Sequence, residues 1–322
     1  MNGPAATNLV LVNLGTPVEA TPASVRAFLH EFLSDPAVVD LPRFLWMPIL
    51  RGMVLRSRPA RVAHQYQSIW TAAGSPLRVA TERIASQAQL LAGERLVIRS
   101  AYRYGEPSID TVLGRIDAAG AGPIIVTPLF PQDTNATTGT VFRRAREAAA
   151  RAGVAHRLVE RLIPAGAAGY IEALAARARA AFDSAGYEPD HLVVSFHGIP
   201  VRYDVREGRR YTRDCDTTFE ALLQALGWAR RRATLAYQSK FGPEPWLKPA
   251  TAPLLAELPA RGVRRVAVIT PGFVTEGLET LEEIAIRGRD TFVGAGGESL
   301  LYIGAVEDHP AFIQALVALA AD

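Results

Sequence analysis

Four acidic residues crowd the segment TPGFVTEGLETLEEIAIRG, residues 270–288 of this 322-residue chain. If the segment forms an α-helix with about 100° per residue, Glu276, Glu279 and Glu283 fall within a sector about 60° wide. Acidic side chains in a first helical turn are stabilised by the helix dipole and need no further role. Glu283 lies beyond that turn, where repulsion from Glu279 costs a few tenths of a kcal/mol. The row is therefore either a structural feature of the helix start or a site for a cation or for shared protons.

His197, in the segment SFHGIP (residues 195–200), is the second candidate for chemistry. A histidine at a strand end is most often a hydrogen-bonded packing residue. Here Gly198 would let a ligand approach the backbone, and the acidic row follows a strand of the same half of the chain. A neutral imidazole that faces carboxylates can accept a proton near pH 7 or bind a divalent transition metal. The spacing is not H-E-x-x-H, so a zinc peptidase site is not predicted.

The elements that must position these residues are short apolar runs that alternate with helix-patterned segments rich in alanine and arginine. Such runs, rich in Val, Ile and Leu, are typical of strands buried on both faces of a parallel sheet. The predicted fold class is α/β, with two Rossmann-like domains that each contain a four-stranded parallel sheet flanked by helices. The runs are 9–14, 96–102, 123–130, 157–162, 191–196, 233–238, 266–270 and 300–304.

The domain boundary is expected at IPAGAAG, residues 163–169, where glycine and proline interrupt the pattern. We therefore predict an N-terminal α/β domain over residues 1–165 and a C-terminal α/β domain, which carries the metal site, over residues 166–307. The final helix, within 308–322, could pack back on the N-terminal domain. Ligands of open parallel sheets bind beyond the carboxyl ends of the strands, so the polar segments at those ends should line the site. Those segments match neither G-x-G-x-x-G nor a P-loop, which disfavours a nucleotide cofactor.

Composition excludes several classes of function. The 35 basic residues are nearly balanced by 32 acidic ones, and no dense Lys/Arg tract is present, so nucleic acid is not a predicted partner. The single cysteine, Cys215, excludes an intrachain disulfide, a cysteine-built zinc site and an iron–sulfur cluster ligated wholly by this chain. The N-terminal residues lack the pattern of a secretory signal, and a cytoplasmic location is expected.

The segment LPRFLWMPILRGMVL, residues 41–55, is apolar but interrupted by Pro48. It is too short and too broken to span a bilayer, which takes about 20 apolar residues. It is either an ordinary core helix or an exposed lip that touches a membrane and admits an apolar substrate. The residues assigned to this lip are Phe44, Leu45, Trp46, Met47, Ile49 and Leu50.

Taken together, the motifs VNLGTP, LFPQ, TTG, SFHGIP, YQSKFGPEPWLKP and PGFVTEGLETLEEI resemble the ferrochelatase family, in order from about residue 9 to about residue 286. The segments MPILRG, GSPL and LETLEEI make the chain most similar to the Gram-negative protoporphyrin enzymes. The resemblance implies the class II chelatase fold, a porphyrin cleft and a metal chelatase, a lyase. The implied reaction is insertion of Fe²⁺ into protoporphyrin IX to form protohaem (haem b), the last step of haem biosynthesis.

The resemblance also assigns roles to residues. It makes His197 and Glu279 the catalytic and metal-site pair, with Glu276 and Glu283 as a path for protons or metal. The implied porphyrin-binding residues are Leu14, Arg103, Tyr104, Trp246 and Phe273.

The resemblance implies Fe²⁺ as a substrate, no permanently bound cofactor and, with Cys215 alone, no [2Fe-2S] cluster. The implied partners are protoporphyrin IX and Fe²⁺; contact with the inner membrane surface and with an upstream porphyrin-producing oxidase is left open. One alternative is a sister chelatase that uses coproporphyrin or inserts cobalt into a sirohydrochlorin. Another is a two-domain binding protein for a tetrapyrrole or a metal that does no chemistry.

Overall fold

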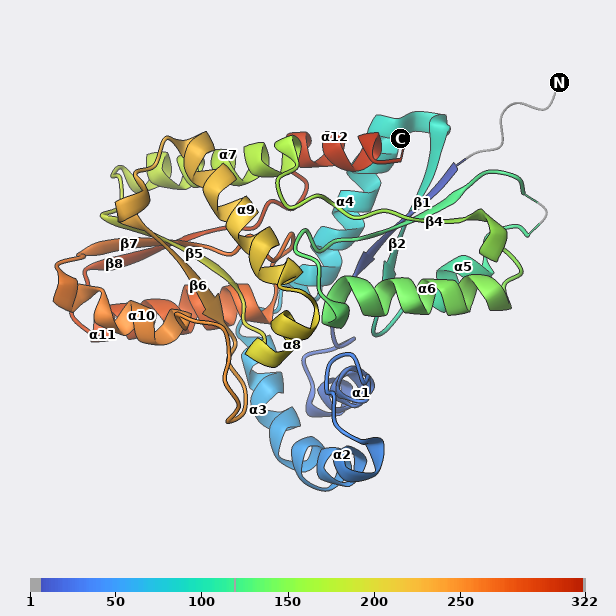
Figure 1. The fold of residues 1–322 in the computed structure, drawn as a ribbon, viewed down its shortest axis with the longest axis horizontal. Helices are drawn as coiled ribbons and strands as arrows, with labels where there is room; N and C mark the ends of the chain where they lie inside the picture. Colours follow the sequence, from blue (N-terminus) through green and yellow to red (C-terminus); the bar gives the residue numbers. More distant parts are fainter. Residues whose placement is uncertain (1–6, 119, 321–322) are drawn as a thin grey trace. The chain divides into compact units, whose positions relative to one another are not determined.

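The computed structural model describes residues 7–118 and 120–320 of the chain (Figure 1). Its contacts divide the chain into two compact units, with the boundary between Ile163 and Pro164. This boundary lies two residues before the one expected from the sequence. The second unit ends at Ala315, and residues 316–320 cluster with the first unit. The final helix, α12 (Pro310–Ala318), therefore spans the second junction.

The first unit contains a four-stranded sheet in the order β2-β1-β3-β4, and every neighbouring pair is parallel. The central strand β1 is buried from its second residue onward, and β3 is buried throughout, as the continuous apolar runs predict. Val10, Val12 and Val126 join the core that α5 and α6 cover. The elements are β1 (Thr7–Asn13), β2 (Leu96–Tyr102), β3 (Ile124–Pro128), β4 (Leu158–Glu160), α4 (Pro76–Ala92), α5 (Ile109–Gly114) and α6 (Thr140–Arg151).

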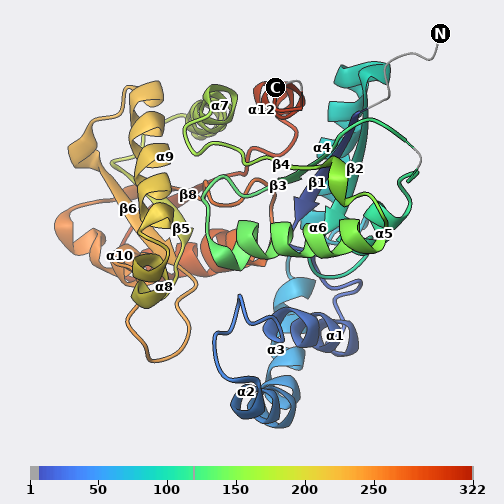
Figure 2. The same cartoon turned by 45° about the vertical axis from the view of Figure 1, so that its right-hand side comes forward.

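A helical extension is inserted between β1 and α4. It consists of α1 (Pro22–Leu33), α2 (Arg43–Ile49), η1 (Leu50–Val54) and α3 (Leu55–Gln67), and Figure 2 shows these helices together at one end of the unit. The extension begins where Thr21 caps α1 by accepting a hydrogen bond from the Ser24 N–H, with Pro22 at the first helical position. It has its own small core of Leu50, Val54 and Leu55.

The second unit contains a parallel sheet in the order β6-β5-β7-β8. In Figure 1, α7 and α9 lie on one face of this sheet, and α10 and α11 lie on the other. The second of these faces packs Val193 and Val268 of the sheet against Leu255 and Phe292 of the helices. The elements are β5 (His191–His197), β6 (Ala233–Gln238), β7 (Arg265–Ile269), β8 (Ser299–Ile303), α7 (Ala168–Ala185), α8 (Val201–Arg206), α9 (Arg210–Leu226), α10 (Thr251–Glu257) and α11 (Arg289–Gly294).

The two units repeat one plan, which confirms the predicted fold of two four-stranded parallel sheets flanked by helices. Strands β1 and β5 occupy the same central position, β2 and β6 are the edge strands beside them, and β3 and β7 pair on the other side. Each unit also places a helix with i→i+5 hydrogen bonds after its third strand, η3 (Asn135–Gly139) in the first and η7 (Leu278–Gly288) in the second. Such helices are rare and frequently mark functional sites.

Candidate active site

His197 is the last residue of β5, and its side chain is held in one orientation. The ring atom Nδ1 lies 2.6 Å from the carbonyl oxygen of Gly198. A carbonyl oxygen only accepts hydrogen bonds, so Nδ1 carries the proton and, in the neutral ring, Nε2 is the unprotonated nitrogen. The backbone is fixed as well, because the Tyr211 hydroxyl donates to the His197 carbonyl at 2.6 Å. His197 therefore presents Nε2 as a proton acceptor or a metal ligand.

Gly198 has a different role from the one that its sequence context predicted. A Cβ atom at this position would lie 2.7 Å from the carbonyl oxygen of Gln238 and 3.1 Å from the ring of Trp246. The space beside Gly198 is filled by these two residues instead of being open to a ligand. Glycine is required here because β5 and β6 and the Trp246 ring pack closely where the two strands end.

The acidic segment is not the regular α-helix assumed from its sequence. The helix η7 starts at Leu278 and has i→i+5 hydrogen bonds, so the sector worked out for an α-helix does not apply. Glu276 precedes the helix. Gly277 stands at the N-cap, and its N–H donates to the Thr280 hydroxyl at 2.9 Å. The wider helix distributes the acidic side chains over the ends of several strands.

Glu279 is the acid that interacts with His197. Its backbone carbonyl accepts a hydrogen bond from the Gln238 side chain at 2.6 Å, which ties η7 to the end of β6. Burial raises the pKa of the Glu279 carboxyl, and although the nearby His197 lowers it, the carboxylates of Glu283 and Glu282 raise it further. The net shift is upward. Glu279 thus holds a proton to a higher pH than an ordinary glutamate does.

Glu283 and Glu276 are held on opposite sides of this pair. The Glu283 carboxylate accepts from the Ser239 N–H at 2.7 Å and from the Ser239 hydroxyl at 2.6 Å, just beyond β6. Ser239 has a φ of 63°, the left-handed conformation that aims its N–H at the acid. The Glu276 carboxylate accepts from the Tyr302 hydroxyl on β8 at 2.9 Å and from the Ala305 N–H at 2.7 Å.

These contacts separate the acids that the sequence grouped as one row. Glu283 is bound at the β6 end of the sheet, Glu276 at the β8 end, and Glu279 interacts with the residue that ends β5. Across the described residues, no three His, Cys, Asp or Glu side chains form a group that could hold a metal ion.

Phe273 and Trp246, the two implied porphyrin-binding residues in this unit, are both partly buried. The Phe273 ring lies 6.2 Å from the His197 ring, measured between centroids. Trp246 is placed by an antiparallel bridge to Pro200. Both aromatic residues therefore lie close to the end of β5, in the same unit as the His197–Glu279 pair.

In the first unit, the structure brings together the three predicted residues at the ends of β1 and β2. The Arg103 N–H donates to the Asn13 carbonyl and the Tyr104 N–H to the Leu14 carbonyl, both at 2.9 Å. Gly15, with a φ of 113°, allows this approach, because a Cβ there would lie 1.8 Å from the Tyr104 carbonyl oxygen. Tyr104 is 1% exposed, whereas Leu14 is partly buried.

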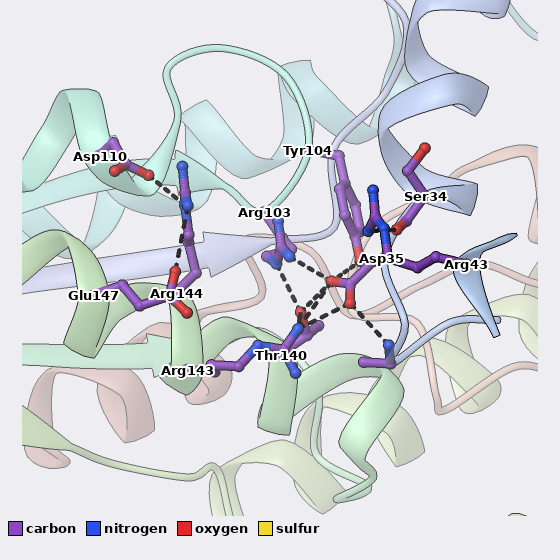
Figure 3. A network of polar contacts seen from close by, with 11 residues as sticks. Ser34, Asp35, Arg43, Arg103, Tyr104, Asp110, Thr140, Arg143, Arg144 and Glu147 are labelled. Atoms are coloured by element: carbon purple, nitrogen blue, oxygen red, sulfur yellow. Dashed lines mark hydrogen bonds and ion pairs between the residues drawn. The ribbon is translucent and has the colours of Figure 1, made fainter. Parts of the chain in front are cut away.

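Sequence reasoning missed a buried carboxylate, Asp35, at the centre of a polar network around Arg103 and Tyr104 (Figure 3). Thr140 and Arg143, at the start of α6, complete the network. Burial raises the pKa of Asp35, but hydrogen bonds from Thr140 and the Ala37 N–H and the charges of Arg103 and Arg143 outweigh it, so the pKa is lowered. The only sequence signal was the Asp-Pro pair, which is typical of a turn.

The segment proposed as a lip has one buried and one exposed side. Phe44, Leu45 and Ile49 are 77%, 52% and 43% exposed. The assignment of Leu50 to the lip was wrong, because its side chain is fully buried in the core of the helical extension. Trp46 and Met47 pack against that core and are only partly exposed. In the described part of the chain, no helix has the length and apolar character needed to cross a membrane.

Comparison with known proteins identifies the family. The ferrochelatase family model matches residues 6–322. The chain is 44% identical to the ferrochelatase of Edwardsiella ictaluri (strain 93-146) over 309 residues, which cover 93% of this chain and 92% of that protein. It is also 44% identical to the ferrochelatase of Bordetella pertussis over 322 residues, with coverage of 98% and 88%.

Solved structures share the fold at low identity. The sirohydrochlorin chelatase SirB from Bacillus subtilis subspecies spizizenii, in complex with cobalt, matches with a TM-score of 0.57 and 11% identity, over 98% of this chain and 94% of that one. CbiX, the terminal enzyme for biosynthesis of siroheme in denitrifying bacteria, matches with a TM-score of 0.51 and 16% identity, over 98% of both chains. Given the family match over nearly its whole length, the chain belongs to the ferrochelatase family of metal chelatases.

Proposed function

We propose that the protein inserts Fe²⁺ into protoporphyrin IX to form protohaem, the last step of haem biosynthesis. One observation carries the proposal: a histidine with Nε2 as its unprotonated nitrogen interacts with a carboxyl group whose pKa is raised, at the strand ends of one unit. Family membership supports the same reaction. The proposal needs neither a resident metal nor an iron–sulfur cluster, since iron is a substrate.

The chemistry to be performed is an exchange of two protons for one metal ion. A free porphyrin is flat, and two of its four ring nitrogens carry protons. Metal can bind all four nitrogens only after pyrroles tilt out of the plane and both protons leave. A site that binds the bent ring better than the flat ring lowers this barrier, because it stabilises a shape close to the transition state.

We assign the proton transfer to His197 and Glu279. Nε2 of His197 accepts the two pyrrole protons in turn and releases the first before it takes the second. The Glu279 carboxylate either relays these protons or holds Fe²⁺ before the ring nitrogens take it over. The raised pKa of Glu279 suits a group that takes up and releases protons closer to neutrality than an ordinary glutamate. Glu276 and Glu283 would continue the path, each held in place by hydrogen bonds.

The remaining assignments concern binding. Leu14, Arg103, Tyr104, Trp246 and Phe273 would contact the porphyrin. The exposed apolar side of α2 would rest on the inner membrane, where an apolar substrate dissolves, and an upstream porphyrin-producing oxidase would deliver the substrate there. Phe44 and Ile49, with Arg43 and Arg51 nearby in the sequence, have the composition of such an interfacial helix.

The direct test is anaerobic incubation of the purified protein with Fe²⁺ and protoporphyrin IX, followed by absorbance. Conversion to haem at a rate proportional to enzyme concentration is expected. Coproporphyrin with Fe²⁺ and sirohydrochlorin with Co²⁺ are the comparison substrates. Faster conversion of either one would replace the proposed function by that of a sister chelatase, and porphyrin binding without conversion would identify a passive binding protein.

A further inference from the structure

Asp35 is a carboxylate with an unusually complete set of donors. Its side chain is 3% exposed. It accepts hydrogen bonds from the Thr140 hydroxyl at 2.6 Å, from the Tyr104 hydroxyl at 3.0 Å and from Arg143 at 2.9 Å, and it pairs with Arg103. The Ala37 N–H donates at 2.8 Å. A buried charge with this many partners is fixed in position, because each lost bond would leave it poorly solvated.

The network holds one side of the Arg103 guanidinium by hydrogen bonds. Nη2 donates to Asp35, and Nε donates to the Thr140 hydroxyl at 2.8 Å, while the central carbon lies 4.4 Å from the centroid of the Tyr104 ring. Within the described residues, Nη1 of Arg103 has no hydrogen-bond partner. Arginine is a long, flexible side chain, and fixing two of its three nitrogens determines where the third one points.

Asp35 reaches this position from a separate part of the unit. It lies in the loop between α1 and α2, just after Leu33, whose carbonyl accepts a hydrogen bond from the Trp46 ring N–H at 2.7 Å. Phe32, in the last turn of α1, packs edge-on against the Tyr104 ring with centroids 5.1 Å apart. The end of α1 and the loop that leads from it into α2 are therefore joined to the residues after β2 by the Asp35 carboxylate and by the Phe32–Tyr104 ring contact.

We propose that Asp35 is a positioning residue that aligns Arg103 and Tyr104 for binding the porphyrin. This inference rests on the proposed function, which places Arg103 against the macrocycle. Asp35 does not touch the substrate; it acts through the guanidinium that it holds, and it couples the orientation of that guanidinium to the loop leading into α2.

The test is Asp35→Asn, which keeps the size of the side chain and removes its charge. The dissociation constant for protoporphyrin IX is measured by absorbance titration, together with KM and kcat for Fe²⁺ insertion. We expect the dissociation constant and KM to rise about tenfold while kcat at saturating porphyrin changes less than about twofold. Asp110→Asn is the matched control, because Asp110 pairs with Arg144 and Arg151 of the same helix α6 and should leave binding unchanged.

A double-mutant cycle separates positioning from a general loss of structure. In an Arg103→Met background, Asp35→Asn should change porphyrin binding less than about twofold, because its effect passes through the missing guanidinium. If the effects of the two substitutions on the free energy of porphyrin binding simply add, Asp35 does not act through Arg103 and the inference is overturned. Unchanged porphyrin binding in Asp35→Asn alone overturns it as well. If Asp35→Asn does not fold, Thr140→Val is the second variant, because it removes the hydroxyl that accepts a hydrogen bond from Nε of Arg103. It should likewise raise the dissociation constant and KM while kcat changes little. An active wild type with an unaffected variant refutes only the role of Asp35, whereas a wild type that neither binds nor metallates porphyrin refutes the proposed function as well.

Discussion

The ring nitrogen Nδ1 of His197 donates to the carbonyl oxygen of Gly198 at 2.6 Å, and this one bond decides which nitrogen of the imidazole can do chemistry. Because Nδ1 carries the proton, Nε2 is the basic atom. The same residue, Gly198, also lets the Gln238 carbonyl and Trp246 pack against it. Orientation of the base and close packing at the end of β5 therefore depend on two adjacent residues.

Glu279→Gln should reduce Fe²⁺ insertion by about 100-fold or more, because the amide can neither take up a proton nor neutralise a cation. Porphyrin binding should change little. Steady-state rates across the pH range are the measurement. In the wild type the rate should rise with pH as Glu279 ionises, and this rise should occur at a higher pH than the one at which an ordinary glutamate ionises. The variant should lack this rise in its pH–rate profile. A variant as active as the wild type would remove Glu279 from the mechanism.

The same substitution should stabilise the fold at neutral pH. The pKa of Glu279 is higher in the folded state than in the unfolded state. At pH values between these two pKa values, the folded chain therefore binds more protons than the unfolded chain. The free energy of unfolding therefore falls as pH rises above about 4 to 5. Tm of Glu279→Gln should exceed that of the wild type at pH 7, and the difference should shrink below pH 4. The exposed Glu257→Gln serves as control, and an equal gain there would show that the effect is not specific to Glu279.

Gly198→Ala should cost about 1–3 kcal/mol in the free energy of unfolding, because the added methyl group meets the Gln238 backbone. Activity should fall too, since His197 and Trp246 both shift. Gly294→Ala is the control, because its Cβ would meet nothing within 4 Å. Chemical denaturation of both variants measures the difference, and equal stabilities would contradict the packing described for the end of β5.

Much of the fold and part of the site could be predicted from sequence. Eight apolar runs matched eight strands, since strands buried on both faces leave a continuous signal. Residues at strand ends, such as His197 and Arg103, could be found because parallel strands end at one edge of a sheet. The residues that orient them could not, since Asp35 and Arg103 are 68 positions apart and no local pattern links them. The i→i+5 geometry of η7 and the burial of Leu50 likewise depend on tertiary packing.

Charged substitutions on the exposed side of α2 should weaken membrane binding. Phe44→Glu combined with Ile49→Glu removes two exposed apolar side chains and should lower the fraction that floats with anionic liposomes by about tenfold. Leu90→Glu is the matched control, because Leu90 is 72% exposed on α4, outside this surface. Equal flotation of all three proteins would show that α2 is not a membrane-binding element.

In the proposed mechanism, His197 removes the pyrrole protons. The His197→Ala variant tests this role when it is incubated anaerobically with Fe²⁺ and protoporphyrin IX while absorbance reports both binding and metallation. His191→Ala, at the other end of β5, is the control. We predict that His197→Ala binds the porphyrin with nearly wild-type affinity and forms haem at least about 100-fold more slowly. Haem formation at the wild-type rate by His197→Ala would show that His197 is not the base.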